Sequence, residues 1–421
     1  MRTLGLLCLT AVCLNAQSLN LSDSYPKFDP AVLPSDSAQT DIFPRPDVLL
    51  PSIAFWKRVY GELTSDQIIF SDDQDLGLVY RVVRISGTGK TRDQAIRQAK
   101  NEVTAALREL EIIQPKSEED LSGVKKEVYL ALKDNSRSDK YNRASSVRIQ
   151  YGLKKQFEEG YRRSGAHEKE IKSRLKKAGL PEELIGIVFV ESLFHPKSRS
   201  SVGATGIWQF MKRTAPEFMR VNKLVDERLD PIVSTDAAIK YIKSAKASLG
   251  EWPLAITSYN YGRGGMAKAA QMVGSRDFGE ILKKYQNPRF GFAARNYYAE
   301  FLAAVDIYKQ AGEIFPDVEP VSSWAYEIIQ LPKAISMRDL LSTKSLEAVW
   351  LKTHNPALSA SAHHSKQILP KGFTLRVPLA HKEKIEKKLA SVREQKSKKR
   401  NKQKNNSSHF TELPKPSVVV N

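Results

Sequence analysis

Apolar residues recur at helical spacing in several stretches of the chain and predict a mainly helical protein. One such helix follows Thr91, which can act as its N-cap. Another is expected between Ser234 as N-cap and Gly250, and a third begins at Pro253 and breaks at Gly262. The longest apolar stripe comprises Ala294, Tyr297, Tyr298, Phe301, Leu302, Val305 and Tyr308. Such stripes indicate helices packed around a common core.

A further helix is predicted to start at Pro181, which is followed by two glutamates in the first turn. Residues 184–190 carry no polar side chain and lead directly to Glu191, and a helix that is apolar on every face is buried. Burial at its end would disfavour the charged carboxylate and raise the pKa of Glu191, as a proton donor to a glycosidic oxygen requires. From these residues alone, a solvated glutamate at a helix end is the simpler interpretation.

The first sixteen residues have the pattern of an export signal. Arg2 supplies a positive charge, a short apolar segment follows, and Ala16 offers a small residue for cleavage. Cys8 and Cys13 both lie in this segment, so cleavage after Ala16 would leave no cysteine for a disulfide. Lipidation of Cys13 is the minor alternative, because Val12 fits a lipobox poorly. We expect export to the periplasm or cell envelope, and no run of about 18 apolar residues indicates a membrane span.

The net charge of +19 is concentrated near the C-terminus. Between His381 and Lys404, eleven Lys or Arg stand against three Glu, a net charge of +8. Such a run is typical of a solvated helix or a disordered tail that is attracted to a polyanion, either the cell wall or an anionic membrane surface. Export argues against nucleic acid as a partner, and neither zinc-ligand spacing nor a Gly-rich phosphate loop supports it. The oligomeric state stays open.

Glu191 opens a segment with a recognisable motif. It reads Glu191-Ser192-Leu193-Phe194-His195-Pro196, then Ser200, then Gly203-Ala204-Thr205-Gly206-Ile207-Trp208-Gln209-Phe210-Met211. This segment resembles the signature of the lytic transglycosylases with the goose-lysozyme-like fold. Downstream, Ser258-Tyr259-Asn260-Tyr261-Gly262 resembles the family's Tyr-Asn-x-Gly segment, and Ala293-Ala294-Arg295-Asn296-Tyr297-Tyr298 stands in the place of its third motif. The nearest branch is the membrane-bound type D enzymes.

The resemblance implies cleavage of peptidoglycan glycan strands. In this family the glutamate of Glu-Ser protonates the glycosidic oxygen between N-acetylmuramic acid and N-acetylglucosamine. It then takes the proton of the muramic acid 6-hydroxyl, which closes a 1,6-anhydro ring in place of attack by water. Glu191 is assigned both roles. No cofactor is expected, and no metal either, because His195 is a lone histidine without a second ligand.

Supporting roles carry over by position. Ser200 and Gln209 match residues that contact the sugar, and Tyr259 and Asn260 match the segment that lines the cleft. Tyr297 matches a tyrosine placed to hydrogen-bond near the catalytic glutamate. Trp208 and Phe194 are candidates for substrate contact, and core packing is the alternative for both; for Phe210 core packing is preferred.

Two departures from the family pattern concern the shape of the cleft. The third motif commonly begins Glu-Thr, where this chain has Ala293 and Ala294, and Tyr261 stands where a small residue is common. A hydrolytic muramidase, which uses a second carboxylate and water, and an inactive peptidoglycan-binding protein remain the alternatives. Glu217 is read as a helix-start glutamate. Further candidates for a second acid are Asp226, Glu227, Asp230 and Glu251.

After Pro316 the pattern changes to a strand over 324–329, a helix over 337–350 and a second strand that ends near Pro378. Asn355-Pro356-Ala357-Leu358 and the closing Leu369-Pro370-Lys371-Gly372 resemble a LysM glycan-binding module. Its usual Gly-Asp-Thr-Leu is replaced by Lys333-Ala334-Ile335-Ser336, so the module is degenerate. Weak glycan binding here would tether an enzyme to its polymer; a structural cap without ligand is the alternative.

These observations divide the chain into six parts. They are a signal peptide at 1–16, an N-terminal extension at 17–115, a helical connector at 116–180, the catalytic domain at 181–312, the degenerate LysM-like module at 313–379 and the basic tail at 380–421. The expected fold class is mainly α, with a helical N-terminal extension and a small α+β module.

Overall fold

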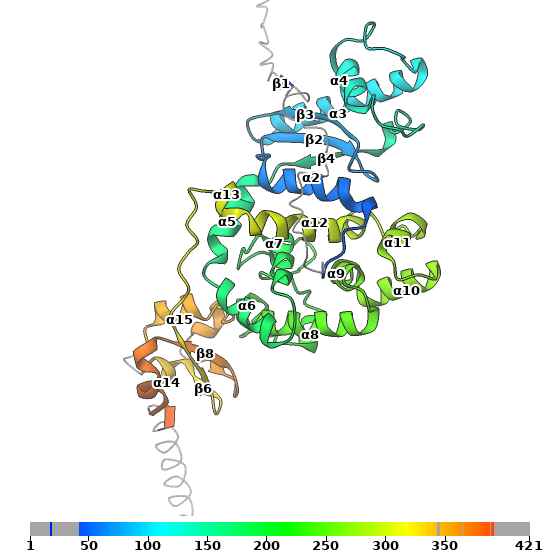
Figure 1. The fold of residues 1–421 in the computed structure, drawn as a ribbon. Coiled ribbons are helices and arrows are strands. Elements are labelled where there is room, and N and C mark those ends of the chain that lie inside the picture. The colour runs from blue at the N-terminus through cyan, green and yellow to red at the C-terminus, as the bar shows by residue number, and fades with distance from the viewer. Residues whose placement is uncertain (1–16, 19–41, 343–345, 365, 388, 391–421) are drawn as a thin grey trace, which may run out of the picture. The chain divides into compact units, whose positions relative to one another are not determined.

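The computed structural model describes residues 17–18, 42–342, 346–364, 366–387 and 389–390. The predicted signal peptide and most of the basic tail lie outside these residues. The described chain forms two compact units (Figure 1). The first comprises Met1–His195 and Ala238–Ser322, and the second comprises Pro196–Ala237 and Ser323–Asn421. The mainly helical fold class is confirmed.

The first unit begins with a mixed α/β part. Its elements are β1 (Gln17–Ser18), η2 (Asp47–Leu49), α2 (Leu50–Gly61), β2 (Gln67–Asp72), β3 (Val79–Arg84), α3 (Gly89–Ile113), α4 (Gly123–Leu132), η3 (Ala144–Ser146) and β4 (Val147–Tyr151). The strands form an antiparallel sheet in the order β1-β3-β2-β4. The sequence analysis missed this sheet. The N-terminal extension 17–115 and the connector 116–180 were both expected to be helical, so β2 and β3 correct the first expectation and β4 corrects the second.

The helical part of the first unit follows. Its elements are α5 (Lys154–Ser164), α6 (Glu168–Lys177), η4 (Glu182–Ile185), α7 (Gly186–Ser192), α8 (Pro231–Leu249), α9 (Trp252–Tyr261), α10 (Arg263–Val273), α11 (Phe278–Lys284), α12 (Phe292–Lys309) and α13 (Ala311–Ile314). Helix α8 belongs to this unit from Ala238 onward, and its earlier residues belong to the second unit. Helix α2 lies between the sheet and α12, and α12 also packs against α7 and α9 (Figure 1). The long stripe predicted for 294–308 is this central helix.

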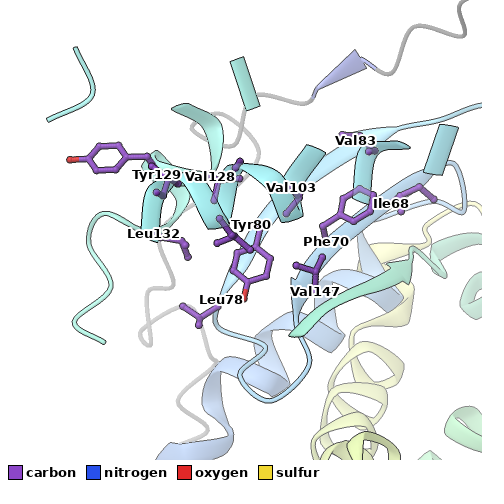
Figure 2. Close-up of a cluster of buried hydrophobic side chains, with 14 of the residues drawn as sticks. Ile68, Phe70, Leu78, Tyr80, Val83, Val103, Val128, Tyr129, Leu132 and Val147 are labelled. Atoms are coloured by element: carbon purple, nitrogen blue, oxygen red, sulfur yellow. The ribbon is translucent and has the colours of Figure 1, made fainter. Parts of the chain in front are cut away.

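The sheet and the helices α3 and α4 enclose a core of their own. Figure 2 shows Phe70 and Tyr80 of the sheet meeting Val103 of α3 and Leu132 of α4. Each of these four side chains is 0% exposed, so water does not reach the contact. Burial of aromatic and branched side chains from five elements stabilises this part by the hydrophobic effect. Helix α4, which lies in the predicted helical connector, therefore contributes to this core.

A buried ion pair joins the last residue of β2, Asp72, to Arg143 in the segment before β4. Asp72 is 0% exposed and accepts from Arg143 at 2.6 and 2.8 Å. It also accepts the Tyr80 hydroxyl at 3.0 Å and the backbone N–H groups of Gln74 and Asp75. Both carboxylate oxygens of Asp72, which burial removes from water, thus accept hydrogen bonds from protein donors.

Two helix starts differ from the sequence expectation. Helix α3 begins at Gly89, before Thr91, and helix α8 begins at Pro231, before Ser234. Proline is preorganised for the first helical position, so α8 starts there. Asp230 provides the cap, because its Oδ1 accepts from the N–H groups of Ile232 and Val233 at 3.0 and 3.1 Å. The Ser234 hydroxyl instead donates to the Asp230 carbonyl.

The second unit contains the remaining elements. They are η5 (Ala215–Glu217), η6 (Glu227–Leu229), β5 (Glu327–Gln330), β6 (Ile335–Ser336), α14 (Met337–Leu341), α15 (Ala348–His354), η7 (Ala360–His363), β7 (Ile368–Leu369), β8 (Thr374–Val377) and η8 (Leu379–His381). Strands β5 and β8 pair antiparallel, as do β6 and β7. In the described residues, no helix is long and apolar enough to cross a membrane.

We expect Asp72→Asn to destabilise the first unit by about 3–5 kcal/mol, because it removes the fully buried counter-charge of Arg143 and leaves that guanidinium only the half-exposed Asp139 at 3.4 Å. The matched control is Glu118→Gln, which removes an ion pair with Lys126 whose two side chains are 43% and 41% exposed. That change should cost at most about 1 kcal/mol. Urea unfolding of the two variants measures both values, and equal effects would contradict the assignment of Asp72 to the core.

Candidate active site

Helix α7 carries Glu191 at the end of a core segment. Leu184, Ile187, Val188 and Phe189 are each 0% exposed. At the start of α7, a Cβ added to Gly186 would come within 2.6 Å of Val305 on α12, so only glycine allows this close approach of the two helices. The sequence-predicted burial of this helix is confirmed. Glu191 itself is only partly buried.

The chain leaves α7 through a strained turn. Leu193 and Phe194 have φ values of 47° and 57°, a left-handed region that non-glycine residues rarely occupy. The Nη2 of Arg163 on α5 donates to the Leu193 carbonyl at 2.7 Å, and Gly160 lies so close that a Cβ there would be 2.9 Å from the same oxygen. Phe194 is 2% exposed and packs edge-on against Phe189. Phe194 therefore packs in the core, the second of the two roles considered for it, and helps to fix the direction of Glu191.

Tyr297 on α12 holds the Glu191 carboxyl. Its hydroxyl donates to Glu191 Oε1 at 2.5 Å, and its side chain is buried. Loss of water around the carboxyl raises the pKa of Glu191 to about 7, although the Tyr297 hydrogen bond acts in the opposite direction by favouring the charged form. At neutral pH Glu191 is therefore present in both its protonated and its ionised form.

Two more tyrosines face this carboxyl. Burial and the electrostatic effect of Glu191 raise the pKa of Tyr259 on α9 and of Tyr297 well above 10. Burial also raises the pKa of Tyr60 on α2, with contributions from Glu300 and Glu191. All three phenols are thus neutral hydrogen-bonding groups at physiological pH. Asn260, next to Tyr259, is exposed.

Glu300 is a second carboxyl near Glu191 that the sequence analysis did not identify. It lies three residues after Tyr297, on the same face of α12. Burial raises its pKa to about 8; the charge of Glu191 adds to this rise, and Arg148 on β4 opposes it. The sequence could have pointed to Glu300 only through its spacing of three residues from Tyr297. That spacing does not by itself distinguish a residue of the site from a solvated one.

The other predicted contact residues lie in the second unit. The Gln209 side-chain Nε2 donates to the carbonyls of Gly206 and Ser198 at 2.7 and 3.2 Å, and these two bonds fix the orientation of the amide. The Ser200 hydroxyl accepts from the Ala204 N–H at 3.0 Å. Trp208 is 0% exposed, and its Nε1 donates to Thr235 Oγ1 at 2.8 Å, so the structure places it in the core and not at a surface.

Three of the five acids considered as partners for Glu191 make other contacts within the second unit. Asp226 binds the guanidinium of Arg228 at 2.8 and 2.9 Å, and Asp230 binds that of Arg376. Glu227 accepts from the Arg220 N–H at 2.6 Å. Glu217 ends a short 3-10 helix, and Glu251, in the first unit, precedes α9. Among the described residues, no group of three or more His, Cys, Asp or Glu is arranged to hold a metal ion.

Comparison with known proteins agrees with the predicted class. Residues 169–282 match the family model described as the transglycosylase SLT domain. Over 196 residues it is 27% identical to the membrane-bound lytic murein transglycosylase D of Escherichia coli K12, and the same values hold for the protein of Escherichia coli O6:H1. These alignments cover 45% of this chain and 42% of each relative, so the chain matches less than half of their length.

Two solved structures show similarity at lower sequence identity. The lytic transglycosylase Slt of Pseudomonas aeruginosa, solved as an inactive mutant, has 19% identity and a TM-score of 0.29 over 53% of this chain and 32% of that one. The 70 kDa soluble lytic transglycosylase SLT70 of Escherichia coli has 15% identity and a TM-score of 0.31 over 55% of this chain and 46% of that one.

The pKa of Glu191 should rise in a Tyr297→Phe variant. Removing the hydroxyl removes the hydrogen bond that favours the carboxylate, so the titration should move upward from about 7, by up to about one pH unit. Carbon-13 NMR of the glutamate carboxyls measures this directly. Tyr141→Phe, far along the chain in the α/β part, is the control and should leave the Glu191 titration in place. A downward shift in Tyr297→Phe would contradict the assigned hydrogen bond.

In a Glu191→Gln variant we expect the pKa of Glu300 to fall below about 8, because the repulsion from the Glu191 charge is lost. The sign for stability follows from the raised pKa. Protonation of Glu300 favours folding up to the ordinary pKa of a glutamate, and this contribution is lost as the pH rises through about 8. The same NMR titration tests it, and an unchanged Glu300 signal would show that the two carboxyls do not interact.

Proposed function

We propose that this protein is a peptidoglycan lytic transglycosylase that cleaves the β-1,4 bond between N-acetylmuramic acid and N-acetylglucosamine, with Glu191 as its acid and base. The Glu191 carboxyl supports this function most directly, because it is bound by Tyr297 at the end of a core helix and its pKa is raised to about 7. The SLT domain match over 169–282 supports the substrate class. A group with this pKa gives up and takes back a proton near neutral pH at little cost.

In the proposed reaction, protonated Glu191 gives its proton to the glycosidic oxygen as the bond from that oxygen to muramic acid C1 breaks. The Glu191 carboxylate then takes the proton of the muramic acid 6-hydroxyl, and the oxygen of that hydroxyl forms a new bond to C1. The products are a free 4-hydroxyl on N-acetylglucosamine and a 1,6-anhydro end. Glu191 finishes protonated, as it began, and no water is consumed.

The states of Glu300, Asp226 and Asp230 favour this single-acid route over hydrolysis. A hydrolase requires a second carboxylate in its ionised form, as base or nucleophile. Glu300, the carboxyl that interacts with Glu191, is predominantly protonated at pH 7 because its pKa is raised to about 8. Asp226 and Asp230 are neutralised by arginines. The substrate's own 6-hydroxyl replaces the missing nucleophile in the proposed reaction.

Several further residues are proposed to bind the glycan strand. Tyr259 and the exposed Asn260 offer a ring and an amide on α9, and the fixed Gln209 amide and Ser200 offer hydrogen-bonding groups in the second unit. Aromatic faces and side-chain amides suit a pyranose, which has an apolar face and hydroxyl edges. The related type D protein is described as membrane-bound, which supports a place in the cell envelope for this protein too.

We expect Glu191→Gln to lower the release of muropeptides from purified peptidoglycan by at least about a hundredfold, since the amide cannot transfer the proton. Mass spectrometry of the native digest should show 1,6-anhydro ends. The control is Glu313→Gln, whose side chain is exposed on α13 and distant in sequence from the site, and which should digest at the native rate.

Three outcomes would overturn parts of the proposal. Full activity of Glu191→Gln would remove Glu191 from the mechanism. Reducing ends in the native digest would make the protein a muramidase. Binding without release of products by the native protein would identify a peptidoglycan-binding protein.

A further inference from the structure

The C-terminal module shares its core with residues 220–230, which follow the loop of Gln209 in the chain. Val225 is 0% exposed and belongs to the same buried cluster as Ile329, Leu351 and Phe373 of the module. Backbone bonds follow the same contact, from Asp226 N to the Ala357 carbonyl at 2.8 Å and from Ser359 N to the Leu224 carbonyl at 3.0 Å. Residues 220–230 therefore pack as part of the module.

A buried ion pair joins the same two parts. Arg376 on β8 and Asp230 before α8 are each 2% exposed. Arg376 donates from Nη2 to Asp230 Oδ1 at 2.6 Å and from Nη1 to Oδ2. The pair is held from both sides, because Asn355 exchanges two bonds with the Arg376 backbone and the N–H groups after Asp230 bind Oδ1. A charge pair buried to this degree requires fixed geometry on both partners.

A second arginine extends the connection to the Gln209 loop. Arg228 is 4% exposed and pairs with Asp226, while its Nη1 donates to the carbonyls of Gly203 and Phe210 at 3.1 and 3.2 Å. Gly206 has a φ of 80°, and a Cβ there would lie 1.8 Å from the Arg228 carbonyl oxygen, so the loop and residue 228 are in direct backbone contact. The loop that fixes the Gln209 amide is thus built against residues bonded to the module.

We propose that the C-terminal module is a rigid support that positions the glycan-binding loop 198–210 through the Arg376–Asp230 pair and Arg228, and does not act as a flexible tether to the polymer. Arg376 and Asp230 are positioning residues, since neither is assigned a contact with substrate. The inference rests on the proposed function for its activity readout, and on exchange measurements for a readout that needs no activity. A tether and a support differ in one respect: only a support affects substrates too short to reach the module's own surface.

The test uses the full mature chain with both partners neutralised, Asp230→Asn with Arg376→Gln, which leaves no unpaired buried charge. The matched control is Asp66→Asn with Arg84→Gln, an ion pair at 3.3 Å whose side chains are 38% and 47% exposed. We expect amides 203–210 to exchange hydrogen at least about tenfold faster in the first variant only. KM should rise at least about fivefold both on a short soluble glycan and on whole peptidoglycan. The kcat, and the pH dependence of the rate that Glu191 sets, should not change.

Unchanged exchange at 203–210 in a folded variant would overturn the proposal, whatever the activity. A loss confined to whole peptidoglycan, with normal KM on the short glycan, would show that the module is a tether. If the native chain cleaves neither substrate, the proposed function fails and the exchange result still decides the support. If the double variant does not fold, exchange of the native chain in rising urea decides: loop 198–210 and strands β5 and β8 should open together, and separate opening would contradict the support.

Discussion

A carboxyl that is partly removed from water at the end of a packed helix is the constraint on which the first unit depends. The raised pKa of Glu191 requires that α7 be apolar up to the residue before it and that α12 lie directly against it. Gly186 allows that approach, and the left-handed pair Leu193 and Phe194 ends the helix so that the carboxyl is not carried into solvent. The strain of this turn is balanced by Arg163 and by the Phe194–Phe189 contact.

Helix α12 connects this constraint to the rest of the unit. Tyr297 and Glu300 approach Glu191 from one face, while Phe301 and Val305 pack near Gly186. Arg148 on β4 lies over the Phe292 ring at 3.5 Å and moderates the pKa of Glu300, so the N-terminal sheet contributes to the electrostatics of the site. The sheet's separate core explains how it keeps this arginine in place: Val147, beside it, is buried among Phe70 and Val103.

The sequence contained much of this site because its signals were local. The apolar run before Glu191 and the stripe through Tyr297 follow helical periodicity, and the Glu-Ser and Tyr-Asn motifs are contiguous. What it did not contain was long-range pairing. Strand β4 was missed because it pairs with β2 across the helices α3 and α4, whereas β2 and β3 pair locally and were not recognised as strands. The role of Asp230 was missed because its partner, Arg376, is 146 residues away. Trp208 and Phe194 could not be assigned between core and surface, since an aromatic residue in a motif has the same pattern in both.

The central claim is that Glu191 transfers protons between two oxygens of the substrate without admitting water. Digestion of peptidoglycan in water enriched in oxygen-18, followed by mass spectrometry of the released strands, tests it most directly. The account predicts ends lighter than hydrolysis products by one water and free of the heavy isotope. Ends that retain the mass of water and carry oxygen-18 would contradict it, because water would then have attacked the sugar.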